Sequence, residues 1–408
     1  MTTKTESKPM APEDATTGTK KFAPWKSFTC WLLALMLVSA FASGNINYLK
    51  NVPQEKMTPA LITKASVAFK LEQFKKIAGK TDVVVVGSSL PMCCLYYADD
   101  PKDQSVIQLM KEKNLNPLQA YTSAQYFSKL SKSSVFNATV AASMISDVHL
   151  IVSKIIDKSP GKIILCVGLR DFADNINCSF AGTPTFQALF DLPYAFSGDN
   201  LPFIFSHASK PIQQELSLYA TLPMYRSHSE IGLAMTYESE KLFKKTDSKI
   251  APKQEAKAET KAVTVKLPTE IEASKLETAS MEEKPVLDSL GYEKRYMPPN
   301  YKQMDLEAQA LDRICQLCKD KRVELVLINM PVSSGHQALS STEMRAKYLD
   351  ILQSISTKYG IKYLNFEKND LIQDKDYLDT VHMGPAGATM FLNHLVSECG
   401  ISNLGSSR

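Results

Sequence analysis

The sequence predicts an α/β fold, a three-layer α/β/α sandwich around a five-stranded and mainly parallel sheet. The first observation is a set of nearly all-apolar runs, VVVV, IILCV and LVLI, which are typical of strands with both faces covered. The second is that strand-like runs alternate with helical patterns along the chain, as in βαβ units. Right-handed crossovers then place helices on both faces of the sheet.

Each element follows from its local pattern. The expected strands cover residues 83–86, 134–137, 162–167, 323–329 and 362–366, and the expected helices lie near 118–130, 144–158, 303–320, 342–358 and 386–398. Helical periodicity places Cys315 and Cys318 on an apolar face, so we interpret this CxxC pair as buried core rather than a metal or redox site. No histidine has the i, i+4 partner of a metal site, and we expect neither a metal nor a cofactor.

Composition divides the chain into one folded domain and two inserted segments. Residues 45–171 and 291–408 carry the strand and helix patterns and form the two parts of the α/β domain. Residues 172–243 are rich in aromatic residues, proline and polar turns, which suits an inserted cap over a binding site. Residues 244–290 turn to Lys, Glu, Ala and Thr with almost no aromatic residues, and we expect a disordered insert there.

The amino terminus has the pattern of a membrane anchor. Residues 1–27 are polar and predict a disordered tail, whereas residues 28–44 carry no charge and predict a single transmembrane helix. Lys20, Lys21 and Lys26 precede the apolar segment, so the positive-inside rule leaves the tail in the cytoplasm. The α/β domain is therefore expected outside the cytoplasmic membrane.

Cleavage of the apolar segment is the alternative. Ala40, Phe41 and Ala42 resemble a signal-peptidase site, and cleavage there gives a secreted protein. Trp25 and Trp31 stand where interfacial anchors are common, and we favour a retained anchor. With 47 Lys and Arg against 43 Asp and Glu, the net charge of +4 is too small and too scattered to indicate nucleic acid as a partner.

The motifs that carry chemistry follow the expected strands. Residues 82–90 read DVVVVGSSL, so Ser88 and Ser89 lie on the turn after the first strand, and Asp379 and His382 form a DxxH pair after the fifth. The carboxyl ends of parallel strands meet at one edge of a sheet, which brings these loops together. Ser89 is the expected nucleophile, His382 the base and Asp379 the residue that orients it. The alternative is that Asp379 only caps the next helix and His382 is a packed loop histidine.

These blocks resemble a known superfamily. GSSL at 87–90 and DTVH at 379–382 are similar to the first and last blocks of the SGNH/GDSL hydrolases, and the anchor, the GSS turn and MGPAGA resemble the DltD-like and polysaccharide O-acyltransferase branch. The resemblance implies that Ser89 carries a transient acyl group during acyl transfer or ester hydrolysis on a cell-envelope glycan or glycopolymer. It also implies a membrane-bound acyl donor protein as a partner. A secreted lipase or esterase and a non-catalytic envelope scaffold are the alternatives.

The middle blocks depart from the superfamily pattern. The second block uses a glycine whose amide faces the oxyanion, and Ala142 stands near that place. The third block is usually GxND, but residues 168–171 read GLRD, so Arg170 replaces the asparagine. The resemblance implies an oxyanion hole formed by the amides of Ser89 and Ala142, and we expect Arg170 to add a charged donor to it or to bind an anionic group of the substrate. The alternative is that Arg170 and Asp171 only satisfy each other.

Further polar side chains are expected at the same edge. Asp171, Asn175 and His336 follow the third and fourth strands, and we expect them to bind substrate. Asn175 and Asn137 are also spare amides that could take the place of the missing asparagine of the third block.

Overall fold

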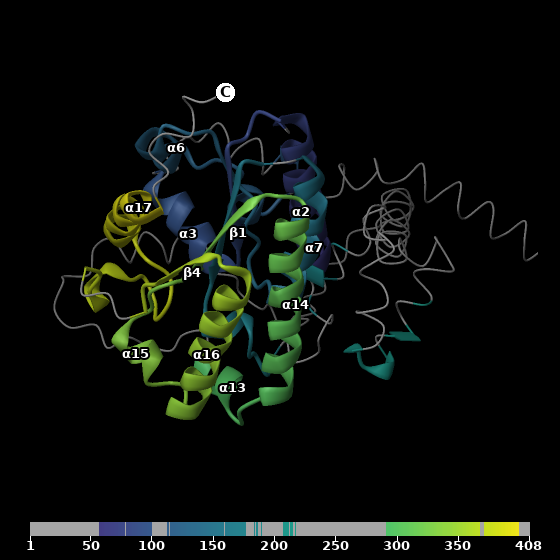
Figure 1. Cartoon of the computed structure of the whole chain (residues 1–408), viewed down its shortest axis with the longest axis vertical. Coiled ribbons are helices and arrows are strands. Elements are labelled where there is room, and N and C mark those ends of the chain that lie inside the picture. The colour runs from purple at the N-terminus through teal and green to yellow at the C-terminus, as the bar shows by residue number, and fades with distance from the viewer. Residues whose placement is uncertain are drawn as a thin grey trace, which may run out of the picture.

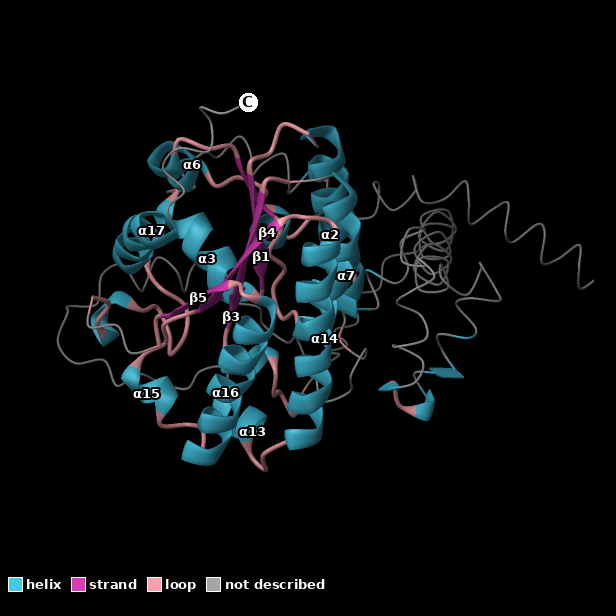
Figure 2. Cartoon of the chain, in the orientation of Figure 1, coloured by secondary structure: helices cyan, strands magenta, loops and turns pink. Residues whose placement is uncertain are grey.

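The computed structural model describes residues 57–77, 79–99, 112–113, 115–158, 160–176, 183, 185–186, 189, 207–211, 213–214, 217, 291–367 and 371–399. Over these residues the chain has an α/β fold with a five-stranded, all-parallel sheet in the order β2-β1-β3-β4-β5. Figure 2 shows the strands running between groups of helices. The predicted α/β class and parallel sheet are confirmed.

The strands match the apolar runs of the sequence. They are β1 Val83–Gly87, β2 Val135–Asn137, β3 Lys162–Val167, β4 Glu324–Asn329 and β5 Lys362–Asn365. β1 and β3 are buried at every residue, because strands inside the sheet are covered on both faces. β5 lies at one edge of the sheet, and its mixed sequence KYLN is partly exposed.

Helices cover both faces of this sheet. They are α2 Pro59–Ile77, α3 Ser89–Ala98, α5 Pro117–Ala120, α6 Gln125–Ser131, α7 Ile145–Ile155, α13 Tyr292–Tyr296, α14 Tyr301–Asp320, α15 Ser334–Gln337, α16 Thr342–Tyr359 and α17 Pro385–Cys399. Figure 1 shows α3, α6 and α17 on one side of the strands and α2, α7 and α14 on the other. α2, α3, α13 and α15 were not predicted from the sequence.

The single helix expected near 118–130 is divided into α5 and α6. The side chain of Asn116 caps α5. Asp99, at the end of α3, accepts hydrogen bonds from the amides of Gln125 and Tyr126 at 2.8 and 2.7 Å. α6 therefore begins where another segment supplies its cap, and the chain turns between the two helices.

The CxxC pair lies in the hydrophobic core. Cys315 and Cys318 are buried on α14, among the apolar side chains that pack against the sheet. Burial raises the pKa of the Cys318 thiol to about 12, as expected for an unreactive core thiol. The interpretation of these two residues as buried core is confirmed.

Several predictions fall outside the described residues. The tail at 1–27, the apolar segment at 28–44 and the insert at 244–290 lie outside them entirely, as does most of the expected cap at 172–243. In the part of the chain that the structure describes, no helix has the length and apolar character needed to cross a membrane.

Candidate active site

Ser89, His382 and Asp379 form a hydrogen-bonded chain beyond the carboxyl ends of the strands. His382 Nε2 lies 2.8 Å from Ser89 Oγ, and His382 Nδ1 lies 2.6 Å from Asp379 Oδ2. All three residues are partly exposed, so a molecule in solution can reach the serine hydroxyl. The structure brings together the three residues that the sequence analysis predicted to act as nucleophile, base and orienting carboxylate.

The turn after β1 determines which serine faces the histidine. β1 ends at Gly87 and α3 begins at Ser89, which places Ser89 on a sharp strand-to-helix turn. Gly87 has φ +149°, and a Cβ there would lie 2.4 Å from the carbonyl oxygen of Cys166 on β3, so this turn requires glycine. Ser88 is buried, and His382 contacts the hydroxyl of Ser89 instead. Ser89 is therefore the candidate nucleophile and Ser88 is a structural residue.

The loop between β5 and α17 holds the imidazole in place. Asp379 Oδ1 accepts hydrogen bonds from the amides of Val381 and His382, each at 2.8 Å. Although burial favours the neutral carboxyl, the hydrogen bond and charge of His382, together with these amides, hold the pKa of Asp379 below its ordinary value. Asp379 is therefore ionised near neutral pH, with one oxygen fixed by the backbone and the other directed at the ring of His382.

A second layer of polar contacts supports this loop. The hydroxyl and the amide of Ser333 donate to the carbonyl of Thr380 at 2.8 and 3.1 Å. His336 Nδ1 lies 3.3 Å from the Thr380 hydroxyl, and His336 Nε2 lies 2.8 Å from the Tyr296 hydroxyl. His336 is buried and connects the segment after β4 to the loop that carries Asp379 and His382. Its contact with a substrate stays a prediction.

Ala142 has the backbone conformation of a glycine. Its φ is +59°, in the left-handed region that residues with a Cβ rarely adopt. The amide of Val140 donates to the carbonyl of Gly87 at 2.9 Å, which fixes this loop beside the serine turn. Ala142 is exposed, and among the described residues no backbone hydrogen bond uses its amide. The role of this amide as a donor to an oxyanion stays a prediction.

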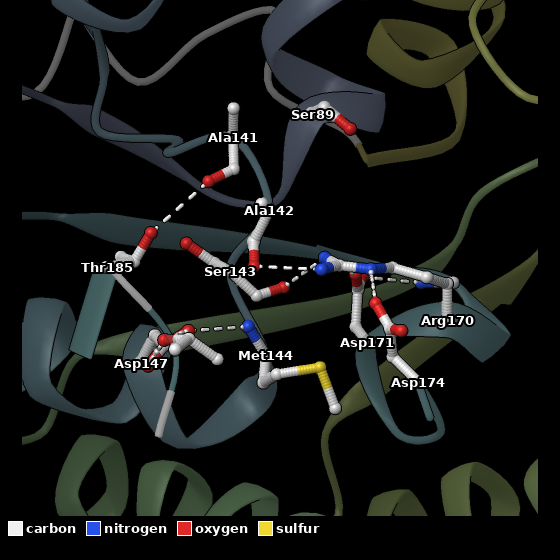
Figure 3. Close-up of polar contacts among 12 residues, drawn as sticks. Ser89, Ala141, Ala142, Ser143, Met144, Asp147, Arg170, Asp171, Asp174 and Thr185 are labelled. Atoms are coloured by element: carbon white, nitrogen blue, oxygen red, sulfur yellow. Dashed lines mark hydrogen bonds and ion pairs between the residues drawn. The ribbon is translucent and has the colours of Figure 1, made fainter. Parts of the chain in front are cut away.

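Arg170 lies buried after β3 with its guanidinium against the Ala142 loop. Nη1 donates to the carbonyl of Ser143 at 2.8 Å, and Nη2 donates to the carbonyl of Ala142 at 2.9 Å (Figure 3). Nε donates to Asp174 at 3.0 Å. Although burial opposes the charge, Asp171 and Asp174 hold the pKa of Arg170 above its ordinary value. Each of its nitrogens has a protein partner, and donation to an oxyanion stays a prediction.

The remaining expected site residues also have partners within the protein. Asp171 is buried, accepts a backbone amide of its own loop at 2.9 Å, and burial raises its pKa to about 6. Asn175 donates its side-chain amide to the carbonyl of Pro298 at 2.8 Å. Asn137 accepts from the amide and hydroxyl of Thr139, while its own buried NH₂ has no partner among the described residues. Substrate binding by Asp171 and Asn175 stays a prediction.

Two residues beside the site were missed by the sequence analysis. Lys70 of α2 is buried and donates from Nζ to the carbonyl of Thr139 at 2.7 Å. The hydroxyl of Thr185 donates to the carbonyl of Ala141 at 3.3 Å. These contacts join positions 69 and 44 residues apart along the chain, and no local motif marks either side chain.

No family model and no curated protein matches this chain. Its function is therefore inferred from the chemistry of the site. A serine hydroxyl bonded to an imidazole that is itself bonded to an ionised carboxylate is suited to nucleophilic attack on a carbonyl carbon. The amide of Ala142 has no backbone acceptor among the described residues and lies in the loop that is bonded to the serine turn through Val140 and Gly87, and such an amide can donate to the negative charge that the attack creates.

Proposed function

We propose that this protein is a serine-dependent enzyme of the SGNH type that transfers or hydrolyses an acyl ester on a cell-envelope glycan or glycopolymer. In this proposal residues 28–44 anchor it in the cytoplasmic membrane, with the α/β domain outside, next to a membrane-bound acyl donor protein. The observation that carries the catalytic part is the chain from Ser89 through His382 to Asp379, with contacts of 2.8 and 2.6 Å. A crevice used only for binding needs no such chain.

In the first half of the reaction, Ser89 Oγ attacks the acyl carbonyl carbon. His382 Nε2 accepts the hydroxyl proton as the new C–O bond forms, and the carbonyl π electrons move to the oxygen. Asp379 stabilises the resulting imidazolium through Nδ1. The amides of Ser89 and Ala142 are the proposed donors to the tetrahedral oxyanion.

The first half ends with an acyl-serine. Collapse of the oxyanion re-forms the carbonyl and breaks the bond to the donor alcohol, which takes the proton from His382 and departs. In the second half, an acceptor hydroxyl attacks this ester while His382 again takes its proton. If the acceptor is a sugar hydroxyl the product is a new ester, and if it is water the product is a free acid. Collapse of the second tetrahedral intermediate returns the proton to Ser89.

Covalent labelling tests the catalytic assignment. The full chain in detergent is incubated with a fluorophosphonate, and the modified residue is located by mass spectrometry. We expect a single adduct on Ser89, loss of labelling in Ser89→Ala, retained labelling in Ser88→Ala and strongly slowed labelling in His382→Ala. An adduct on Ser88, or His382→Ala labelling at the wild-type rate, contradicts the assignment.

The acceptor and the anchor are tested separately. Acid release from p-nitrophenyl acetate that is unaffected by added envelope glycan favours a simple esterase, whereas an acylated glycan detected by mass spectrometry favours transfer. Cell fractionation tests localisation, because a retained anchor keeps the full-length chain in the membrane pellet. A soluble product that begins after Ala42 indicates the secreted alternative instead.

A further inference from the structure

The loop that carries Ala142 is held through its backbone carbonyls. Four consecutive or near-consecutive carbonyls accept side-chain hydrogen bonds: Thr139 from Lys70, Ala141 from Thr185, and Ala142 and Ser143 from Arg170. Figure 3 shows Thr185 and Arg170 reaching this loop from different sides. All three donor side chains are buried, so water competes poorly for these bonds.

The bond from Thr185 bears directly on the direction of the Ala142 amide. A peptide group is planar and trans, so the carbonyl of Ala141 and the amide of Ala142 point in opposite directions within one plane. The Thr185 hydroxyl fixes that carbonyl at 3.3 Å on one side. The amide hydrogen of Ala142 is thereby directed away from Thr185.

Arg170 holds the other end of the same residue. Its Nη2 donates to the carbonyl of Ala142 at 2.9 Å, and Nη1 donates to the next carbonyl, that of Ser143, at 2.8 Å. Two neighbouring carbonyls therefore face one planar guanidinium, whose fork geometry suits such a pair. Because φ of Ala142 is +59°, a conformation that alanine rarely adopts, the loop depends on these outside contacts to keep its shape.

We propose that Thr185 and Arg170 are positioning residues of the oxyanion hole, which hold the Ala142 amide ready for the developing negative charge. The catalytic meaning of this assignment rests on the proposed function. Arg170 stands where the resembled superfamily has an asparagine donor, and in this chain it acts on the oxyanion through the loop. Arg295 and Arg170 both pair with the carboxylate of Asp174. This shared partner connects helix α13, which carries Arg295, to the guanidinium that holds the Ala142 loop.

Conservative variants test the positioning role. Thr185→Val keeps the shape of the side chain and removes only its hydroxyl, and Thr185→Ser restores a hydroxyl. Arg170→Lys keeps the charge beside Asp174 but cannot hold two carbonyls in one fork. With p-nitrophenyl acetate we expect kcat to fall about tenfold in Thr185→Val, near wild-type kcat in Thr185→Ser, and a fall of about 10- to 100-fold in Arg170→Lys, each with KM nearly unchanged.

Hydrogen exchange provides a readout that does not depend on activity. We expect faster amide exchange in the peptide covering 138–144 for Thr185→Val and Arg170→Lys, with unchanged exchange across β4. Arg345→Lys is the matched control, because Arg345 also pairs with a buried carboxylate, that of Glu367, and its hydrogen bonds do not involve the loop.

The outcomes separate the two proposals. Wild-type exchange at 138–144 in both variants, or kcat within twofold of wild type in both, overturns the positioning assignment while labelling of Ser89 leaves the proposed function intact. If the wild-type protein reacts with neither the ester nor the fluorophosphonate, the proposed function fails, and exchange alone decides whether Thr185 and Arg170 hold the loop.

Discussion

Asp379→Asn removes the charge of the triad with little change in shape. The backbone amides of Val381 and His382 donate to Asp379 Oδ1, and an asparagine carbonyl oxygen can accept both bonds. The new NH₂ then lies where Oδ2 was, 2.6 Å from His382 Nδ1. An NH₂ group can only donate, so it selects the tautomer with the proton on Nε2. That nitrogen can no longer accept the proton of Ser89.

The expected loss in the rate of attack by Ser89 is about 10⁴-fold, the size of the kcat loss that the wrong histidine tautomer produces in a Ser-His-Asp triad, or about 5 kcal/mol in the barrier. Fluorophosphonate labelling rates measure it, and urea unfolding checks that the unfolding free energy changes by no more than about 1 kcal/mol. Asp376→Asn is the control, because Asp376 lies in the same loop but its carboxylate accepts a hydrogen bond from the amide of Gln373 instead of contacting His382. A labelling rate of Asp379→Asn within tenfold of wild type refutes the role of Asp379 as orienter.

Three further predictions concern the loops around the triad. Gly87→Ala forces a Cβ to 2.4 Å from the Cys166 carbonyl oxygen, and we expect urea unfolding to show a loss of about 1–3 kcal/mol or more. Ala142→Gly relieves a left-handed alanine at φ +59°, so the same assay should show a gain of about 0.5–1 kcal/mol; a loss contradicts the strain. Burial lowers the pKa of Lys70 to about 7, so between about pH 7 and 10 the unfolded chain holds a proton at this residue that the folded chain does not, and the contribution of Lys70 to stability, measured against Lys70→Met, rises with pH. Lys70→Met lacks this rise, and parallel pH profiles of the two proteins contradict the assignment.

The inner strands were predictable because burial on both faces restricts their sequences. β1, β3 and β4 lie inside the sheet, and each contains a run of apolar residues that is typical of a strand covered on both faces. The division between α5 and α6 was not predictable, because the cap on Gln125 and Tyr126 comes from Asp99. Helix α3 was missed for a different reason: Leu90 to Leu95 are all buried, so the segment has no polar face and no amphipathic pattern.

The triad was predictable because its residue types and order are restrictive, and parallel strands bring their loops to one edge. The direction in which a side chain points, in contrast, cannot be predicted from the residue type and its order in the chain. The sequence shows that Arg170 replaces an asparagine, but only the structure shows its guanidinium against the carbonyls of Ala142 and Ser143. Thr185 belongs to no motif, and its proposed positioning role depends on a hydrogen bond to the carbonyl of Ala141, which lies 44 residues earlier in the chain.

The partners in the Ser89–His382 hydrogen bond are 293 positions apart. A ribosome adds roughly 5–20 residues per second, so the imidazole is synthesised tens of seconds after the hydroxyl it must meet. During that interval the emerging polypeptide holds a serine with no base, and truncated products that stop before His382 have none either. Under the proposed chemistry, the timing of synthesis therefore delays ester-cleaving capacity until the loop that carries His382 has been made, and no separate inhibitory segment is needed for this.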